Sequence, residues 1–240
     1  MNRTNLKPRS LDWHRVGIVT LLAMAAVASA EPHPDRCEEI VLEAMRVAKL
    51  QQERLPPYSV HCRYTIRNKH LNSPVVLQVL WRYIPGVGKR FEILDEGGAS
   101  GITRQAILKV LADEAKSSQL NIDPAAITPE HYTFESTAAD QLEYKLRLRP
   151  KVKSKYLLNG YAYIIRKGGS LSRVQGTTSR RISFWVGEAD ILQEFAKYGG
   201  YWLPSRTQSA AEVRLIGRTE LTIEAGPYLF DVQSAHFKQR

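Results

Sequence analysis

Residues 58–67 read YSVHCRYTIR, and this stretch decides the class of the fold. Apolar and aromatic residues occupy every second position from Tyr58 to Ile66, and mostly polar residues fill the positions between them. Successive side chains of a β-strand point to opposite faces of the sheet. The alternation therefore predicts a strand with one buried face and one exposed face.

Regular apolar patterns also lie on both sides of this stretch, some with the period of a helix and others with the period of a strand. Upstream, apolar residues at helical spacing predict an amphipathic helix from Asp35 to just before Pro56. A second helix is predicted over residues 103–115, and the turn formers of residues 119–139 indicate a long connection. Further strands are predicted at residues 75–83, 90–95, 142–149, 156–166, 171–177, 180–186, 190–198, 201–211, 212–217 and 220–225.

This order of elements indicates a mainly β protein of the α+β class. Consecutive hairpins in such number favour a single twisted antiparallel sheet that curls into an incomplete β-barrel of about ten strands. Two or so helices each have an apolar face that must be buried. We expect them to pack on the concave face of the sheet.

The first thirty residues are typical of a cleavable signal peptide. A basic segment with Arg3, Lys7 and Arg9 precedes an apolar run, and Ala28-Ser29-Ala30 supplies the small residues of a cleavage site. The run is shorter than the roughly 20 residues of a membrane span, although an uncleaved anchor is the alternative. We expect residues 1–30 to be removed and residues 31–240 to form one periplasmic domain.

The chain is basic, with a formal net charge of +10. Removal of residues 1–30 would lower it to about +7, because four basic residues and Asp12 leave with them. An exported protein does not meet nucleic acid, so anionic lipid head groups are the better partner for this charge, and solubility alone is the simpler explanation. We expect a monomer.

Cys37 and Cys62 are the two cysteines of the chain. Export would permit a disulfide between them. Each also fits a buried apolar position, Cys37 on the first helix and Cys62 in the first strand, so both alternatives stay open.

No pattern typical of an enzyme appears. The histidines lack metal-ligand spacing, and no nucleophile motif or phosphate-binding loop is present. The sequence therefore predicts a protein that is not an enzyme and needs neither cofactor nor metal.

Aromatic and aliphatic stripes offer a binding surface instead. If they line the concave side of the sheet, they could hold an acyl chain, which needs no catalytic group. The residues predicted to line such a cavity are Tyr64, Ile66, Leu77, Val79, Trp81, Tyr144, Leu146, Tyr161 and Tyr163.

A basic run follows in the middle of the chain. Its cations occupy alternate positions, and we expect them to bind anionic lipid head groups in transient contact with a membrane surface. They are Arg147, Arg149, Lys151, Lys153 and Lys155. An exposed strand face that discourages edge pairing is the simpler explanation of the same pattern.

Several segments resemble proteins of one known group. They are TPEHYTF (128–134), LRLRPKVKSKYLLNGYAYI (146–164), LSRVQG (171–176), ISFWV (182–186), GGYWLP (199–204) and LTIEAGPYLF (221–230). With the order of elements, they make the chain similar to the LolA-like superfamily of periplasmic lipoprotein carriers and outer-membrane lipoprotein-sorting proteins, which includes LolA, LolB and the N-terminal domain of RseB.

The resemblance implies an open β-barrel with an apolar cavity for acyl chains. It implies a periplasmic carrier of lipids or of lipoprotein acyl chains. The alternative within the same group is a protein-interaction module that senses envelope stress.

Overall fold

The computed structural model describes residues 34–97, 101–119 and 125–230. The predicted signal peptide lies outside these residues. In the part of the chain that is described, no helix combines the length and the apolar character needed to cross a bilayer.

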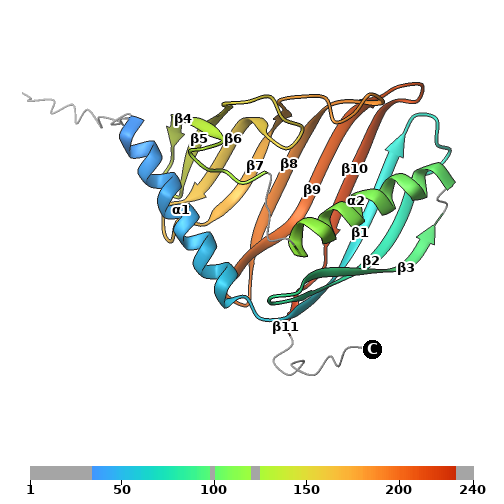
Figure 1. The fold of residues 1–240 in the computed structure, drawn as a ribbon, viewed down its shortest axis with the longest axis horizontal. Helices are drawn as coiled ribbons and strands as arrows, with labels where there is room; N and C mark the ends of the chain where they lie inside the picture. Colours follow the sequence, from blue (N-terminus) through green and yellow to red (C-terminus); the bar gives the residue numbers. More distant parts are fainter. Residues whose placement is uncertain (1–33, 98–100, 120–124, 231–240) are drawn as a thin grey trace, which may run out of the picture. The chain divides into compact units, whose positions relative to one another are not determined.

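Two helices and eleven strands make up the described residues. They follow in the order α1 (Pro34–Arg54), β1 (Tyr58–Asn68), β2 (Val75–Ile84), β3 (Gly88–Gly97), α2 (Gly101–Gln119), β4 (Tyr132–Ala139), β5 (Glu143–Pro150), β6 (Leu158–Ile165), β7 (Leu171–Thr178), β8 (Val186–Tyr198), β9 (Tyr201–Val213), β10 (Gly217–Ala225) and β11 (Leu229–Phe230). Figure 1 shows them as a ribbon.

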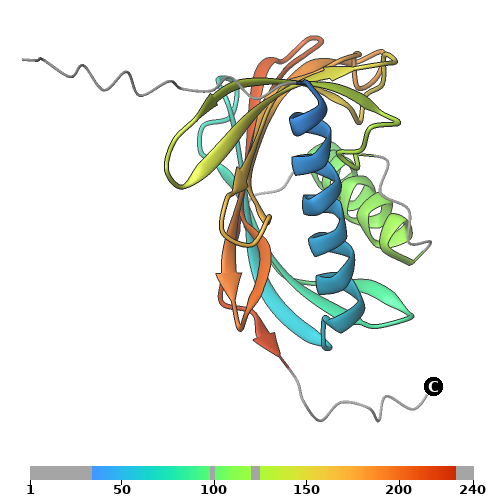
Figure 2. The same ribbon diagram turned by 90° about the vertical axis from the view of Figure 1, so that its left-hand side faces the viewer.

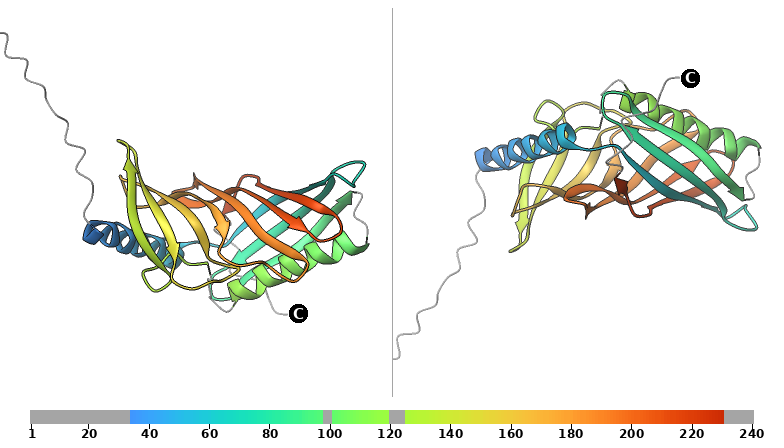
Figure 3. Two further views of the ribbon diagram at one scale, coloured as in Figure 1. Left: turned by 90° about the horizontal axis from the view of Figure 1, so that it is seen from above. Right: turned by 90° about the horizontal axis from the view of Figure 1, so that it is seen from below.

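All strands belong to one antiparallel sheet. Its order is β3-β2-β1-β10-β9-β8-β7-β6-β5-β4, and the short β11 continues beside β1. Strands β3 and β4 form the two edges and do not pair with each other, so the sheet curls without closing (Figure 3). This confirms the predicted incomplete barrel with two helices.

Both helices lie on the same side of the sheet, which we call the inner face (Figure 2). Helix α2 packs its Ile107 and Leu111 on β1–β3, in a cluster that contains Leu77 and Val79. Helix α1 packs Cys37 and Val41 on the other half of the sheet. Strand β1 is paired with β10, so the first three strands are joined to the C-terminal meander along one continuous ladder.

Three boundaries differ from the sequence-based expectation. The predicted connection 119–139 contains strand β4, because residues 132–139 pair with β5. The predicted strand 180–186 is mostly a loop, and β8 begins at Val186. The predicted strands 201–211 and 212–217 are replaced by β9, which runs to Val213, and a turn that leads into β10.

Candidate functional site

A small cavity lies on the inner face, between the sheet and α2. It has a volume of about 90 Å³. Its walls are the inward side chains of β1, including Tyr58 and Tyr64, together with Trp81 of β2 and the inner faces of β8–β10. The wall is therefore largely aromatic and aliphatic, with a few polar groups such as Gln193 and Thr207.

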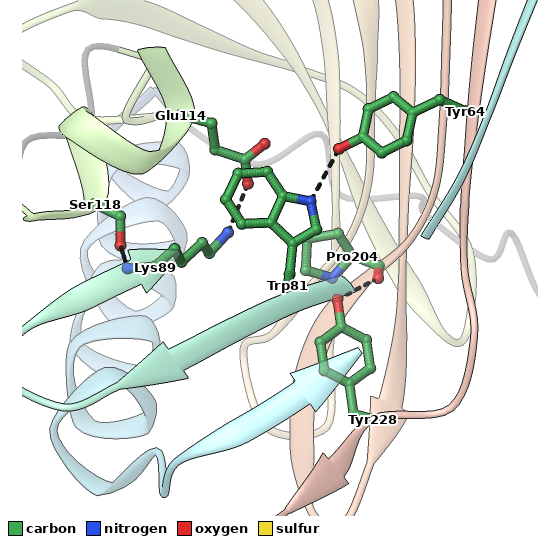
Figure 4. A network of polar contacts seen from close by, with 7 residues as sticks. All are labelled: Tyr64, Trp81, Lys89, Glu114, Ser118, Pro204 and Tyr228. Atoms are coloured by element: carbon green, nitrogen blue, oxygen red, sulfur yellow. Dashed lines mark hydrogen bonds and ion pairs between the residues drawn. The ribbon is translucent and has the colours of Figure 1, made fainter. Parts of the chain in front are cut away.

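An ion pair spans one side of this cavity. The Lys89 ammonium of β3 lies 2.8 Å from a carboxylate oxygen of Glu114 on α2. The backbone N–H of Lys89 donates a second hydrogen bond of 3.1 Å to the Ser118 hydroxyl, also on α2. Figure 4 shows both contacts beside the Trp81 ring. Together they attach the C-terminal half of α2 to the start of β3.

Lys89 has a mixed environment. Burial of its ammonium disfavours the charge, but Glu114 and neighbouring groups more than compensate and raise the pKa of Lys89 above its ordinary value. The ammonium lies 5.8 Å from the centre of the Trp81 ring, so its charge also faces an aromatic surface. Lys89 is thus a cation at the edge of an apolar space.

The aromatic wall is tied together by hydrogen bonds. The Trp81 indole N–H donates to the Tyr64 hydroxyl at 3.0 Å, and the Tyr228 hydroxyl donates to the Pro204 carbonyl at 2.8 Å (Figure 4). Burial raises the pKa of Tyr64 and of Tyr228, so both phenols stay neutral. Tyr58 stacks on Tyr83 and meets Tyr228 edge to face, with centroid distances of 5.1 and 5.2 Å.

The predicted cavity residues of β1 and β2 do share the inner face. Tyr64, Ile66, Leu77, Val79 and Trp81 belong to one buried cluster with α2. Of these, Tyr64 and Trp81 line the cavity itself.

The two predicted residues of β5 lie on the inner face elsewhere. Leu146 is fully buried against Cys37 and Val41 of α1, and Tyr144 lies one pair further along the same face. This half of the inner face is filled by the protein's own side chains, so the two residues do not meet the cavity beneath α2.

Tyr161 and Tyr163 were expected on the inner face, and this prediction is wrong. In the β5–β6 ladder they pair with Arg147 and Lys145, whereas Leu146 pairs with Ala162. The guanidinium of Arg147 lies 4.8 Å from the Tyr161 ring centre, and that of Arg173 lies 3.9 Å from the Tyr163 ring centre. Both rings therefore belong to the outer face, where cations cover them.

The basic run does not form one surface. Arg147 donates to the Asn159 side chain at 2.9 Å, and Arg149 pairs with Glu135 at 2.8 Å, both on the outer face of β5. The strand ends at Pro150, so Lys151, Lys153 and Lys155 lie in the connection to β6 instead.

The disulfide that the sequence left open is not formed. Cys37 and Cys62 are free thiols, and each is buried in a different hydrophobic cluster. Cys37 lies on α1 over β5, whereas Cys62 lines the cavity beneath α2. Their separate burial supports the alternative that both act as small apolar residues.

A larger groove of about 490 Å³ lies on the outer face across β6–β10. Its floor is the backbone of a row of paired positions, Gly160, Gly176, Ile191, Ser209 and Leu221. The side chains of Ile191 and Leu221 pack on the inner face. A Cβ at Gly160 would lie 2.0 Å from the Gln175 carbonyl oxygen, so no side chain fits there. The walls are mostly amides, hydroxyls and carboxylates, which suit a polar ligand.

The sequence had missed the Lys89–Glu114 pair. A lysine after a turn and a glutamate on a helix usually face solvent, and no spacing relates the two positions. The described residues hold no group of three or more His, Cys, Asp or Glu side chains placed to bind a metal ion.

Comparisons with known proteins bear on the fold. No protein-family model matches the chain, and no curated protein matches it. Solved structures do match. A DUF1329 family protein from Desulfovibrio piger is 10% identical, with a TM-score of 0.41, over 82% of this chain and 94% of that chain.

Two further matches carry names from the group that the sequence resembles. A putative outer membrane lipoprotein-sorting protein domain from Vibrio parahaemolyticus is 10% identical, with a TM-score of 0.41, over 80% of this chain and 94% of that chain. A LolA superfamily protein from Nitrosomonas europaea is 12% identical, with a TM-score of 0.37, over 85% of this chain and 97% of that chain. The chain is similar to these structures in fold, and its function is inferred below from its own residues.

Proposed function

We propose that the protein binds a ligand with an acyl chain and an anionic head group on the inner face beneath α2. The observation that carries the proposal is the aromatic-walled cavity with the Lys89–Glu114 pair at its edge. The walls suit a hydrocarbon chain, and the ammonium suits a carboxylate or a phosphate.

Binding of a whole acyl chain requires α2 to move away from the sheet. The cavity of about 90 Å³ is small, and α2 buries Ile107 and Leu111 completely or almost completely beside it. Releasing two such side chains costs roughly 3 to 6 kcal/mol, at about 1.5–3 kcal/mol each. A chain of about 14 methylenes would recover roughly 11 kcal/mol before ordering costs, so the ligand can displace the helix.

The same movement would free the Lys89 ammonium. Glu114 travels with α2, and without its carboxylate the lysine would be an unpaired cation at an apolar wall, which is unfavourable. An anionic head group would replace Glu114 as its partner. We therefore expect fatty acids to bind more tightly than uncharged lipids of the same chain length.

A pair of matched substitutions tests where the ligand binds. Ala225→Phe adds a ring inside the cavity, whereas Ala210→Phe adds the same ring to the outer groove. We expect Ala225→Phe to abolish binding of a fluorescent fatty acid and Ala210→Phe to leave it unchanged. Circular dichroism and thermal unfolding check that both variants are folded.

Competition tests the head group. Palmitate should displace the fluorescent fatty acid more effectively than the matching fatty alcohol, and Lys89→Met should remove most of that difference. If the wild-type protein binds no acyl probe at micromolar concentration, the proposal is wrong.

The outer groove supports a second candidate function, a protein-interaction module. Its polar walls could accept the backbone and side chains of an extended peptide. In that case Ala210→Phe, and not Ala225→Phe, would impair the protein in an assay of envelope stress or in capture of its partner by crosslinking.

We also propose that the protein is exported to the periplasm and acts there as a binding protein rather than an enzyme. The proposal rests on the basic segment, the apolar run and the Ala28-Ser29-Ala30 site. N-terminal sequencing of the protein from a bacterial envelope fraction should give a start near Glu31. Recovery of the intact Met1 would contradict cleavage.

A further inference from the structure

One end of the sheet carries four hairpin connections, which we call the basic end: residues 69–74 (β1–β2), 151–157 (β5–β6), 179–185 (β7–β8) and 214–216 (β9–β10). In an antiparallel sheet of this strand order, these four connections emerge at the same end (Figure 1). The basic end is therefore a single surface built from distant parts of the sequence.

Hydrogen bonds join neighbouring connections. The backbone N–H of Arg214 donates to the Trp185 carbonyl at 2.8 Å, and the Asn68 side chain donates to the Ile216 carbonyl at 3.0 Å. The backbone N–H of Ser154 donates to the Ser179 hydroxyl at 2.9 Å. The connections thus hold one another in place.

The charge of the basic end has one sign. Its four connections contain seven Lys and Arg residues and no Asp or Glu; the cations are Lys69, Lys151, Lys153, Lys155, Arg180, Arg181 and Arg214. In the α2–β4 connection at the same edge, the described residues 125–131 add one carboxylate, Glu130, whose pKa is lowered chiefly by a hydrogen bond with the Thr128 side chain and to a smaller extent by the nearby Lys151. The four connections themselves are strongly positive.

Large apolar side chains are exposed among these cations. The exposed fraction is 90% for Leu215, 64% for Phe184, 62% for Val152 and 56% for Trp185. The Phe184 and Trp185 rings pack edge to face, with centroids 5.1 Å apart, and the Arg214 guanidinium lies 4.1 Å from the Phe184 ring centre. Aromatic rings flanked by cations are suited to the head-group region of a bilayer.

Leu215 has an unusual backbone conformation. Its φ is 74°, and among the described residues it is the one non-glycine residue with a positive φ. Glycine adopts this conformation without strain, whereas leucine does not. A leucine at this position therefore keeps an apolar side chain at the tip of the turn at a cost to the backbone.

We propose that the basic end docks on an anionic membrane surface, with Phe184, Trp185 and Leu215 inserted among the head groups and the cations near lipid phosphates. Clustered cations are attracted to anionic lipids, and apolar side chains at the same tip add insertion to that attraction. The proposal is independent of ligand binding beneath α2, because none of its residues lines that cavity.

Leu215→Gly is the sharpest test, because it removes the apolar side chain and relieves the backbone at the same time. Its control is Leu142→Gly in the β4–β5 turn at the other end of the sheet, where the leucine is also exposed. In flotation with vesicles of phosphatidylglycerol and phosphatidylcholine, Leu215→Gly should bind about tenfold more weakly than the wild type. Leu142→Gly should bind as the wild type does.

The charge and the insertion are tested separately. Replacing Lys153, Arg180 and Arg181 by Gln should reduce binding and flatten its salt dependence. Brominated lipids should quench wild-type tryptophan fluorescence, and Trp185→Phe should remove that quenching. The Ala225→Phe variant, which fills the ligand cavity, should still bind vesicles.

Three results would overturn the proposal. The first is equal vesicle binding by Leu215→Gly and Leu142→Gly. The second is equal binding of the wild type to purely zwitterionic and to anionic vesicles. The third is the absence of vesicle binding together with concentration-dependent dimers that Leu215→Gly dissolves, which would make the basic end an interface between copies of the chain.

Discussion

The Trp81 indole N–H donates a 3.0 Å hydrogen bond to the Tyr64 hydroxyl, and both side chains are buried on the inner face beneath α2. A buried indole N–H without a partner is costly, so this bond fixes the position of two large rings at once. It joins β1 to β2 through side chains, in addition to the backbone ladder.

We expect Tyr64→Phe to destabilise the protein by about 1–3 kcal/mol, because the Trp81 N–H would lose its acceptor in a dry environment. Urea denaturation measures this change. Tyr156→Phe, at an exposed tyrosine, is the control and should change stability by less than about 0.5 kcal/mol. Equal effects of the two substitutions would show that the bond contributes nothing.

Leu146→Ala should destabilise the protein more than Tyr64→Phe does. Its side chain is 0% exposed and packs against Cys37 and Val41 of α1, so truncation leaves a cavity and should cost about 2–5 kcal/mol. Leu142→Ala, in the turn just before the same strand, removes the same atoms from a side chain that is 73% exposed. Thermal unfolding should show almost no change for that variant.

The Cys62 thiol should make the protein sensitive to alkaline pH. Burial raises its pKa from 9.0 to about 11. Between these values the unfolded chain loses the thiol proton while the folded chain keeps it, so stability falls as pH rises above about 9. Over the whole range, the free energy of unfolding should fall by about 3 kcal/mol through this thiol, at 1.36 kcal/mol per pKa unit.

Denaturation at several pH values between 8 and 11 tests this contribution. Other buried groups also titrate there, so the informative quantity is the difference in slope between the wild type and Cys62→Ala. The variant should lose stability less steeply. The native thiols of Cys37 and Cys62 should also resist alkylation until the protein unfolds, because both are buried.

The ion pair of Lys89 and Glu114 should affect the entry of an acyl chain into the cavity more than the stability of the protein. The two side chains are 28% and 42% exposed, so Glu114→Gln should cost no more than about 1 kcal/mol. If α2 must leave the sheet before an acyl chain enters, the same substitution should speed association of a fluorescent fatty acid in stopped-flow experiments. Asp113→Gln, one position along α2, is the control. Slower or unchanged association in Glu114→Gln would argue against movement of α2.

The sequence determined the class of the fold through local patterns. Alternation at Tyr58–Ile66 and in the later strands requires a sheet with a dry face, and the pairing in β1 places all five of these apolar residues on the inner face. The spacing of Cys37 and Val41 likewise placed the buried side of α1. These features follow from the period of the backbone, which neighbouring residues fix by themselves.

The tertiary structure alone decided which stripe of β6 faces inward. Tyr161 and Tyr163 alternate with Gly160 and Ala162, and either stripe can be buried as far as periodicity is concerned. Ala162 is buried in a cluster with Leu148 and Val174, whereas Arg147 and Arg173 cover the tyrosine rings outside. The Lys89–Glu114 pair and the basic end have the same origin, since each joins residues that only the pairing of distant strands and helices brings together.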